Sequence, residues 1–599
     1  MKILFGKHLD GSPAPSPWEG IGRLVCGPSG FLGVLEQSFG VHPQESVSDL
    51  ARLISCREAA SAWMKQCDTA FFRRSFEAES LSTSRTLLRW RDELRLAGWS
   101  LAAETETEIP PRLRDLAGIE SIAPHDAAFR FGVAERIERI LAALNQGQCS
   151  RIESITTIDA PESFPSLWRR LLTQLGAVHD PLLPDCALAP KGTALHALQT
   201  RLLEKEGEAP HVKIPGDDSV VLLRDFSEVG LSRAAAQFLG EWPDPSQGVL
   251  IASAESLARL NEALARLDLP QFPARESTTA SPLSQLLPLA LRLHWLPFDP
   301  QAWLEFLLHP VCPIPGLLRF RLADAINERP GRENALWRSA ITRARERASS
   351  DPARAARLET AIADWVQVPG HRREDGLPGQ MIAATCRKLS EWMQSVFTAR
   401  KISGEEGASA WASGAGAAQA FGEACANLSA VSPLELDRLL AIWLPTLGQA
   451  VQTAGDLGTP VPLSCPDPVL EPVSRILWWQ PTGSGLRRNP WTSQERDWLA
   501  ARGAGLLSAQ AEAEASERAA HRALLFARTS VTFFLPPGNS DAPASPLLTR
   551  LGAEIGANQV GDASRLVRTV PIAVRPLPEP KRWWRLSKRG LLPPRERES

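Results

Sequence analysis

Short apolar runs that alternate with helical stretches limit the possible folds of this chain more than any other feature. Residues 23–26 (Arg-Leu-Val-Cys) predict a strand, residues 27–30 a turn, and residues 31–40 a helix with apolar residues at helical spacing. Another strand is expected over residues 151–159, which ends at Asp159, and a helix follows it. A strand, a turn and a helix in this order are typical of the start of a mononucleotide-binding α/β fold.

A second block of the same kind begins near Val220. Its expected elements are strands at 220–223, 248–252, 475–479 and 531–535, with helices at 231–240 and 256–267. Strands that alternate with helices favour a parallel sheet, because the crossover helix returns the chain to the same end of the sheet. The expected fold class is therefore α/β with parallel sheets, and 531–535 is expected to be the last strand.

The length of the chain requires more than one domain. A single hydrophobic core stops growing at roughly 250–300 residues, and this chain has 599. The pattern predicts a first domain with a helical insertion, a second domain with a helical insertion, and a proline-rich basic tail: 1–215 with about 46–145 inserted, 216–535 with about 282–447 inserted, and 536–599. Within the second insertion, the small residues of 403–416 predict a loop.

Charge and cysteine usage argue against several classes of protein. The net charge of −2 argues against a basic surface over the whole chain, although a local basic groove would suffice to bind DNA. The nine cysteines form no CxxC pair and the ten histidines show no metal-ligand spacing, so we expect no disulfide framework, no metal and no cofactor. No apolar run reaches roughly 18 residues and the N-terminus has no leader-like segment, so we expect a cytoplasmic protein without membrane contact.

The glycine-rich turn has the position of a phosphate-binding loop but lacks its reactive residues. It contains Gly27, Pro28, Ser29, Gly30 and Gly33. A working loop of the form GxxxxGK, with Ser or Thr next, uses the lysine to reach the β- and γ-phosphates and the hydroxyl to bind Mg²⁺. Val34 and Leu35 follow Gly33 instead, so ATP hydrolysis is excluded. An anion could still bind at the helix N-terminus, and a tight turn kept for packing is the alternative.

Asp159 has the position of a second nucleotide-binding acid. Such a strand ends in paired acids, one for Mg²⁺ and one for water, but the neighbour here is Ala160. The alternative is that Asp159 caps the turn that follows it. HExxH and GxSxG are absent from the sequence as well, and no expected strand pair carries the Asp and the acid-x-Lys of PD-(D/E)XK nucleases. We therefore expect no catalytic residue in this chain.

Two segments that combine basic and aromatic residues are candidates for DNA contact, because cations can follow phosphates while indole rings stack on bases. The first is the tail segment with Lys581, Arg582, Trp583, Trp584, Arg585, Lys588 and Arg589. The alternative role of this segment is that of a linker whose tryptophans pack on the rest of the protein while its charged side chains face water. The second comprises Arg89 and Arg91 on either side of Trp90 in an expected helix, and its alternative is a salt-bridged packing role.

The order of several segments is similar to that of the AddB/RexB-like proteins, which are inactivated superfamily 1 helicases that usually carry a C-terminal PD-(D/E)XK nuclease domain. These segments are Cys26–Gly33, Leu87–Leu94 with Gly98 and Trp99, Ser281–Leu283, Asp299–Pro310 and Glu517–Arg528. The resemblance implies two degenerate RecA-like domains with large helical insertions. It also implies that Arg518, Arg522 and Arg528 lie near the motif that supplies an arginine to the nucleotide. Without a nucleotide, a solvated helix face is their alternative role.

The same resemblance implies a non-catalytic DNA-binding and scaffolding subunit of a helicase–nuclease complex in double-strand-break repair and recombination. Such a subunit would pair with an AddA-like helicase–nuclease and guide one strand of a tailed duplex. Two alternatives remain open. The chain could be the front part of a PD-(D/E)XK exonuclease whose catalytic domain is missing or separately encoded. It could also be an adaptor that binds other proteins through a retired nucleotide-binding fold.

Overall fold

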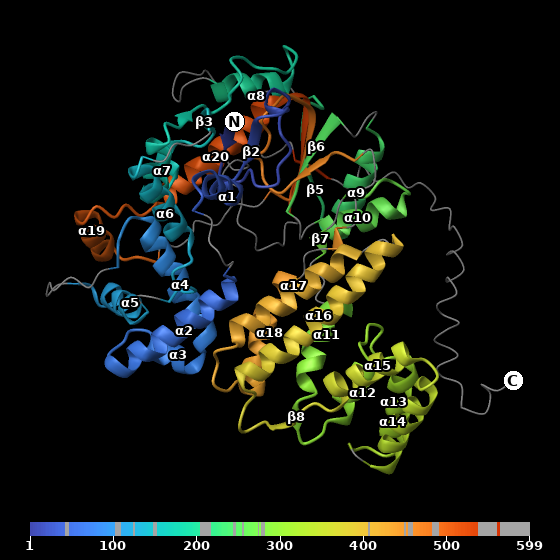
Figure 1. Cartoon of the computed structure of the whole chain (residues 1–599). Coiled ribbons are helices and arrows are strands. Elements are labelled where there is room, and N and C mark those ends of the chain that lie inside the picture. The colour runs from blue at the N-terminus through green and yellow to red at the C-terminus, as the bar shows by residue number, and fades with distance from the viewer. Residues whose placement is uncertain are drawn as a thin grey trace.

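The computed structural model has a mixed α/β architecture with two parallel sheets and two helical regions (Figure 1). It describes residues 1–41, 47–101, 109–123, 126–147, 152–203, 217–242, 247–253, 257–272, 275–276, 282–332, 334–404, 408–447, 451–452, 459–481, 490–536 and 560–562. The α/β class and the parallel sheets expected from the sequence are confirmed.

The first sheet has, within the described residues, four parallel strands in the order β2-β1-β3-β4. They are β1 (Lys2–Phe5), β2 (Arg23–Cys26), β3 (Ser154–Thr157) and β4 (Val178–His179). The chain leaves β1 toward one edge and β3 toward the other, so the topological switch point lies between the carboxyl ends of β1 and β3. Ligands of open α/β sheets bind at such a point.

Three helices cover one face of this sheet: α1 (Pro28–Phe39), α6 (Val133–Asn145) and α7 (Ser166–Gln174). Their apolar side chains share a buried cluster with Ile3 and Phe5 of β1. The expectation of a turn at 27–30 is wrong, because Gly27 is the N-cap of α1 and residues 28–30 are its first turn. Pro28 suits the first helical position, since it lacks the N–H that a helix start leaves unpaired.

The segment between β2 and β3 is mainly helical, as expected for this part of the chain. Besides α6 it contains α2 (Asp49–Gln66), α3 (Arg73–Ala78), α4 (Ser80–Leu96) and α5 (Pro111–Ile122). These helices enclose a separate buried cluster that includes Cys56, Leu87 and Leu113. Trp491 and Leu499 join the same cluster from the end of the chain, where α19 (Ser493–Ala501) packs beside α5. The first helical region is thereby tied to a segment almost 400 residues away in the sequence.

The second sheet has six parallel strands among the described residues, in the order β11-β6-β12-β13-β5-β14. They are β5 (Val220–Arg224), β6 (Gly248–Ile251), β11 (Val461–Leu463), β12 (Val473–Trp479), β13 (Ala527–Phe534) and β14 (Val560–Asp562). The four strands expected from the sequence are all present. The expectation that 531–535 is the last strand is wrong, because β14 follows it and pairs with β5.

Helices cover both faces of this sheet. One face carries α9 (Glu228–Gly240) and α10 (Leu257–Arg266), and the other carries α8 (Ala194–Leu203) and α20 (Ala509–Phe526). Alternate residues of one strand therefore enter different cores: Trp478 lies with α8 and α20, whereas Trp479 lies with α9 and α10. Burial on both faces explains why these strands read as continuous apolar runs.

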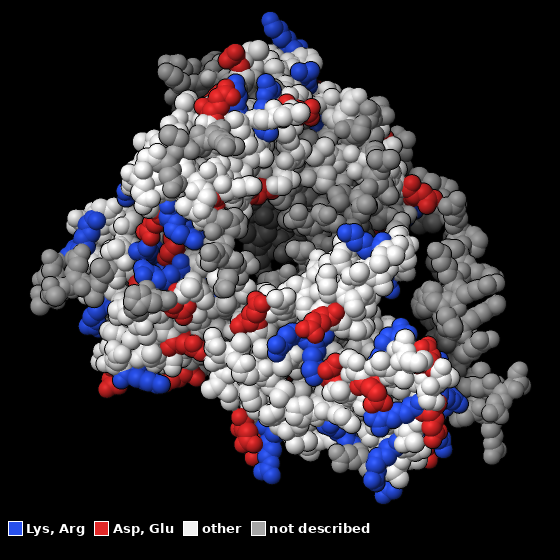
Figure 2. Space-filling model, viewed as in Figure 1, with Lys and Arg blue, Asp and Glu red and all other residues white. Residues whose placement is uncertain are grey.

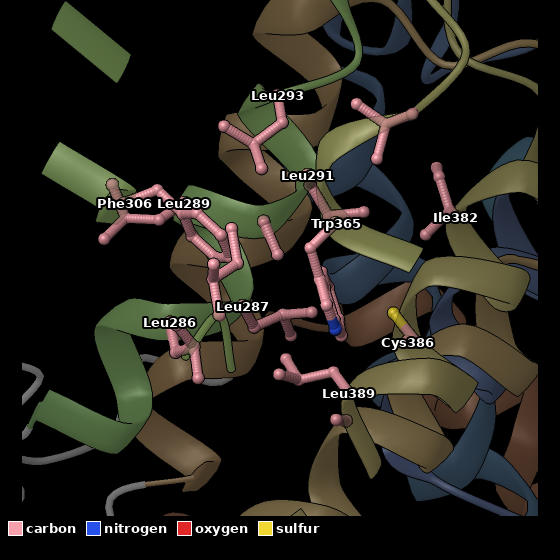
Figure 3. Packing of buried hydrophobic residues seen from close by; sticks show 14 of the residues in the cluster. Leu286, Leu287, Leu289, Leu291, Leu293, Phe306, Trp365, Ile382, Cys386 and Leu389 are labelled. Atoms are coloured by element: carbon pink, nitrogen blue, oxygen red, sulfur yellow. The ribbon is translucent and has the colours of Figure 1, made fainter. Parts of the chain in front are cut away.

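The second helical region lies between β6 and β11 in the sequence and forms the lower right of Figure 1. Its helices are α11 (Pro282–Arg292), α12 (Pro300–Leu308), α13 (Gly316–Glu328), α14 (Ala335–Ala348), α15 (Pro352–Ala361), α16 (Gly379–Ser403), α17 (Ala408–Cys425) and α18 (Pro433–Leu447). Figure 3 shows its core, where Trp365 lies between the leucines of α11 and Ile382, Cys386 and Leu389 of α16.

The described residues also contain several short elements: β7 (Arg275–Glu276), β8 (Trp295–Leu296), β9 (His371–Arg372), β10 (Val451–Gln452), and the helical turns η1 (Ser16–Trp18), η2 (Pro161–Ser163) and η5 (Ile362–Val366).

The expectation of a loop at 403–416 is wrong for residues 408–416, which belong to α17. The small residues that suggested a loop allow α17 to pack closely on α16. A Cβ atom added at Gly414 would lie 3.2 Å from the sulfur of Met393, and further along α17, outside the expected loop, one added at Gly422 would lie 2.7 Å from Cβ of Cys386. Alanine also has the highest helix propensity, so close packing and propensity act together here.

Candidate functional site

The N-terminus of α1 occupies the position of a phosphate-binding loop, and a side chain of the protein itself fills it. The carboxylate of Asp10 accepts hydrogen bonds from three backbone N–H groups, those of Gly27 (2.9 Å), Ser29 (2.9 Å) and Gly30 (3.0 Å). These N–H groups have no partner inside the helix and favour an anion. An internal carboxylate therefore satisfies the groups that would hold a phosphate.

The approach of Asp10 depends on glycine at position 27. A Cβ atom there would lie 2.6 Å from both the backbone N and Cγ of Asp10. Burial, with a smaller contribution from Asp10, raises the pKa of the Cys26 thiol to about 12, so this cysteine stays protonated. Gly33 has open space around it, and Leu35 is fully buried in the core of the first sheet. A leucine thus packs close to where a phosphate-binding loop needs a hydroxyl.

We expect Asp10→Ala to destabilise the start of α1 by about 1–2 kcal/mol, because it removes the acceptor of three N–H groups at a helix N-terminus. Hydrogen exchange of residues 27–32 should become faster, while exchange in α16 should not change. Asp10→Asn keeps an oxygen acceptor and should have a smaller effect. An Asp10→Ala protein with unchanged exchange at 27–32 would contradict the role assigned to this carboxylate.

Asp159 lies at the end of β3, beside the switch point, and is 8% exposed. Its carboxylate accepts a hydrogen bond from the backbone N–H of Lys7 (2.8 Å). The following turn η2 begins without a side-chain cap, so the alternative role of capping that turn is not seen. The ammonium group of Lys7 donates to the carbonyl of Ser163 and lies 5.2 Å from the centre of the Phe164 ring. Burial lowers the pKa of Lys7, and the opposite charge of Asp159 offsets part of that effect.

Arg522 and Asp467 bring charges from the second sheet to the same place. Arg522 is 4% exposed and donates through Nη2 to the backbone oxygen of Asp467 (2.9 Å). Burial lowers the pKa of Arg522, which Asp467 and Asp159 counteract. Burial also raises the pKa of Asp467; the charge of His8 opposes this rise and that of Asp159 adds to it. The solvated role expected for the three arginines is therefore wrong for Arg522.

The other two arginines of that set lie at the surface. Arg518 pairs with Glu514 at 3.9 Å, with half of each side chain exposed. Arg528 is exposed at the start of β13. Sequence reasoning missed Lys7, Asp10 and Asp467. The apolar run Ile3-Leu4-Phe5 before Gly6 and Lys7 was the available signal for a strand that ends at the switch point.

A groove of about 760 Å³ separates the first helical region from the end of the second. Its walls come from α2, α4, α18 and residues 505–512, and Figure 2 shows the molecule hollowed between the sheets and the helical regions. Apolar side chains such as Leu88, Trp443 and Leu506 form much of the lining. Elsewhere on this face, basic and acidic side chains are interspersed (Figure 2).

Arg89, a predicted DNA contact, lines this groove together with Arg85, one helical turn before it on α4. Both side chains are exposed, and neither forms an ion pair with another described residue. Arg91 is different, because it is 2% exposed and forms ion pairs with Glu120 (2.8 Å) and Glu135 (2.5 Å). Its guanidinium group is not accessible to DNA here, and the salt-bridged packing role fits Arg91.

The candidate tail residues Lys581, Arg582, Trp583, Trp584, Arg585, Lys588 and Arg589 lie outside the described residues. In the part of the chain that the structure describes, no group of three His, Cys, Asp or Glu side chains is arranged to hold a metal ion. None of the helices in that part is both long enough and apolar enough to cross a bilayer. A scan against protein-family models finds no match, and no curated protein matches the chain.

Proposed function

We propose that this chain is a cytoplasmic, non-catalytic DNA-binding and scaffolding subunit of a helicase–nuclease complex in double-strand-break repair and recombination. Its two sheets would be degenerate RecA-like domains, and its partner an AddA-like helicase–nuclease. The observation that carries the proposal is the Asp10 carboxylate at the N-terminus of α1. A nucleotide would have to displace this carboxylate before its phosphates could reach the helix.

Binding of a nucleic acid strand is the activity that such a body retains. The groove beside α4 combines apolar side chains with the exposed Arg85 and Arg89, and four acidic residues line it as well. Apolar and aromatic side chains can face bases, while arginines separated by one helical turn can contact successive phosphates. Duplex DNA exposes phosphates but keeps its bases stacked, so this combination favours a single strand.

Binding to a duplex with a single-stranded tail, measured at several salt concentrations with and without ATP, tests the proposal. We expect affinity to fall steeply with salt, because each phosphate contact releases counterions, and to be indifferent to ATP. No binding at low salt would overturn the DNA-guiding role and favour a protein adaptor. ATP turnover, or release of DNA by ATP, would overturn the assignment of Asp10.

Arg85→Ala combined with Arg89→Ala should weaken binding roughly tenfold or more at about 0.1 M salt and reduce the salt slope by about 1.4, since each phosphate contact on a single strand contributes roughly 0.7. The matched control is Arg343→Ala with Arg347→Ala, a pair of exposed arginines with the same spacing on α14. An equal loss in both double variants would show that general positive charge, and not the groove, determines binding. Lys581, Arg582 and Arg585 should be replaced by alanine separately, so that the tail contribution is measured on its own.

A further inference from the structure

The segment between β11 and β12 leaves the second sheet and lies on the carboxyl edge of the first. Leu470 forms a buried cluster with Leu4, Leu9 and Ile158, and all four are at most 6% exposed. Leu470 comes from the second sheet unit, whereas the other three belong to the first. The contact therefore connects the two units through apolar side chains.

The apolar cluster around Leu470 lies at the switch point of the first sheet. Leu4 belongs to β1, Leu9 follows β1, and Ile158 follows β3. These residues surround the switch point between β1 and β3, where open α/β sheets bind their ligands. The chain itself places Leu470 at that point.

Polar contacts fix the same segment on both sides. On the first unit, Ser16 donates to Oε2 of Glu471 through its backbone N–H (2.9 Å) and its hydroxyl group (2.7 Å). On the second unit, Arg522 of α20 holds the backbone oxygen of Asp467 at 2.9 Å. Asp467 is 7% exposed and lies near the buried Asp159. The segment is thus held by its own sheet unit and by the opposite one.

We infer that residues 464–471 form a latch, which occupies the switch point of the first sheet in place of a ligand and holds the two sheet units in one arrangement. The latch also has a mechanical connection to the groove. Helix α20 contacts the latch through Arg522 near its end and lines the groove through Ala509 and Glu512 at its beginning. Release of the latch would remove one polar contact of a helix that forms part of the groove wall, while the end of this helix stays packed on the second sheet. The latch stands on these contacts and is independent of the proposed DNA binding.

Hydrogen exchange of the full-length protein, without DNA, tests the latch. Leu470→Asp places a charge in the apolar cluster and should raise exchange rates roughly tenfold or more in residues 6–16 and 464–471. The strands β12 and β13 in the centre of the second sheet should keep their protection. Leu434→Asp is the matched control, because Leu434 is 62% exposed in the first turn of α18; it should leave both segments unchanged.

Two outcomes would overturn the latch. A folded Leu470→Asp protein with unchanged exchange at residues 6–16 would show that the segment does not hold the first unit. Faster exchange spread evenly over both sheets would show that Leu470 is an ordinary core residue. If Leu470→Asp does not fold, Glu471→Ala provides the test, since it removes only the acceptor for Ser16. It should raise exchange several-fold in residues 12–18, and no change there would contradict the latch.

Discussion

Arg91→Ala is expected to lower the free energy of unfolding of the first helical region by about 3 kcal/mol, because it removes the closest cation from two buried carboxylates, which keep only the longer ion pairs with Arg95 and Arg130. Nε of Arg91 lies 2.8 Å from Oε2 of Glu120, and its Nη2 lies 2.5 Å from Oε1 of Glu135. The guanidinium group also lies 4.8 Å from the centre of the Phe129 ring. Glu120 and Glu135 are only 7% and 8% exposed, so water cannot replace the lost partner fully.

The electrostatic evidence agrees with this contact geometry. Burial acts to raise the pKa of Glu135, but the charge and hydrogen bond of Arg91, together with a backbone hydrogen bond and the charge of Arg95, lower the pKa overall. Glu135 also accepts a hydrogen bond from the backbone N–H of Gly132 at the start of α6 (3.0 Å). Loss of Arg91 should therefore weaken the start of α6 as well as the contact between α4 and α5.

Arg89→Ala is the matched control, since Arg89 lies two positions earlier on the same helix and is exposed. It should change stability by less than about 0.5 kcal/mol. Hydrogen exchange in α4, α5 and α6 measures the loss of stability in both variants. The loss in Arg91→Lys should be intermediate, because lysine keeps the positive charge but lacks the planar guanidinium group that bonds two carboxylates. Equal destabilisation by Arg89→Ala and Arg91→Ala would contradict the assigned network.

Helical spacing could have predicted from the sequence that Arg91 is buried and Arg89 is exposed. Residues 89 and 91 are about 200° apart around a helix, and Arg91 lies four residues after Leu87 and three before Leu94, which are both buried. The spacing thus places Arg91 on the apolar face, where an arginine requires acidic partners. The identity of those partners was not predictable, because Glu120 and Glu135 come from other helices.

Most strands with several consecutive β-branched or large apolar residues were predicted, because burial on both faces gives a strong signal, but β1 with its run Ile3-Leu4-Phe5 was missed. β4 and β14 have two and three residues, too few for any pattern to emerge. The role of Asp10 was equally hidden. It precedes the glycine that it contacts by 17 positions, and only the parallel pairing of β1 with β2 brings the two together. The contacts of the latch with the first unit join positions more than 300 residues apart, which sequence patterns do not encode.

Acidification should loosen the core of the second helical region through His294. This side chain is 2% exposed; its Nδ1 lies 3.0 Å from the carbonyl oxygen of Pro369 and its Nε2 lies 2.9 Å from the hydroxyl of Thr385. Burial lowers the pKa of His294 to about 4, and the neighbouring charges of His371, Lys388 and Arg332 contribute in the same direction. The ring is therefore neutral in the folded protein at pH values where it is charged in the unfolded chain.

The direction of the pH effect follows from proton uptake. Between pH 6.5 and about 4 the unfolded chain binds a proton at His294 that the folded chain does not bind, so stability rises with pH in this interval. The contribution is complete above about pH 6.5 and is lost as the pH falls toward 4. The lowered pKa of His294 should therefore cost the folded state about 3 kcal/mol of stability at pH 4 and about 2 kcal/mol at pH 5, relative to neutral pH.

His294→Gln should therefore reduce the dependence of local stability on pH by about 2 kcal/mol between pH 7 and pH 5, although it also lowers stability at neutral pH. Hydrogen exchange in α11 and α16, corrected for the intrinsic effect of pH, measures this difference. His179→Gln, at an exposed position on β4, should leave the pH dependence unchanged. If wild type and His294→Gln lose protection equally between pH 7 and pH 5, the buried neutral state of His294 is refuted, because no other change in the variant removes a proton-binding group from this core.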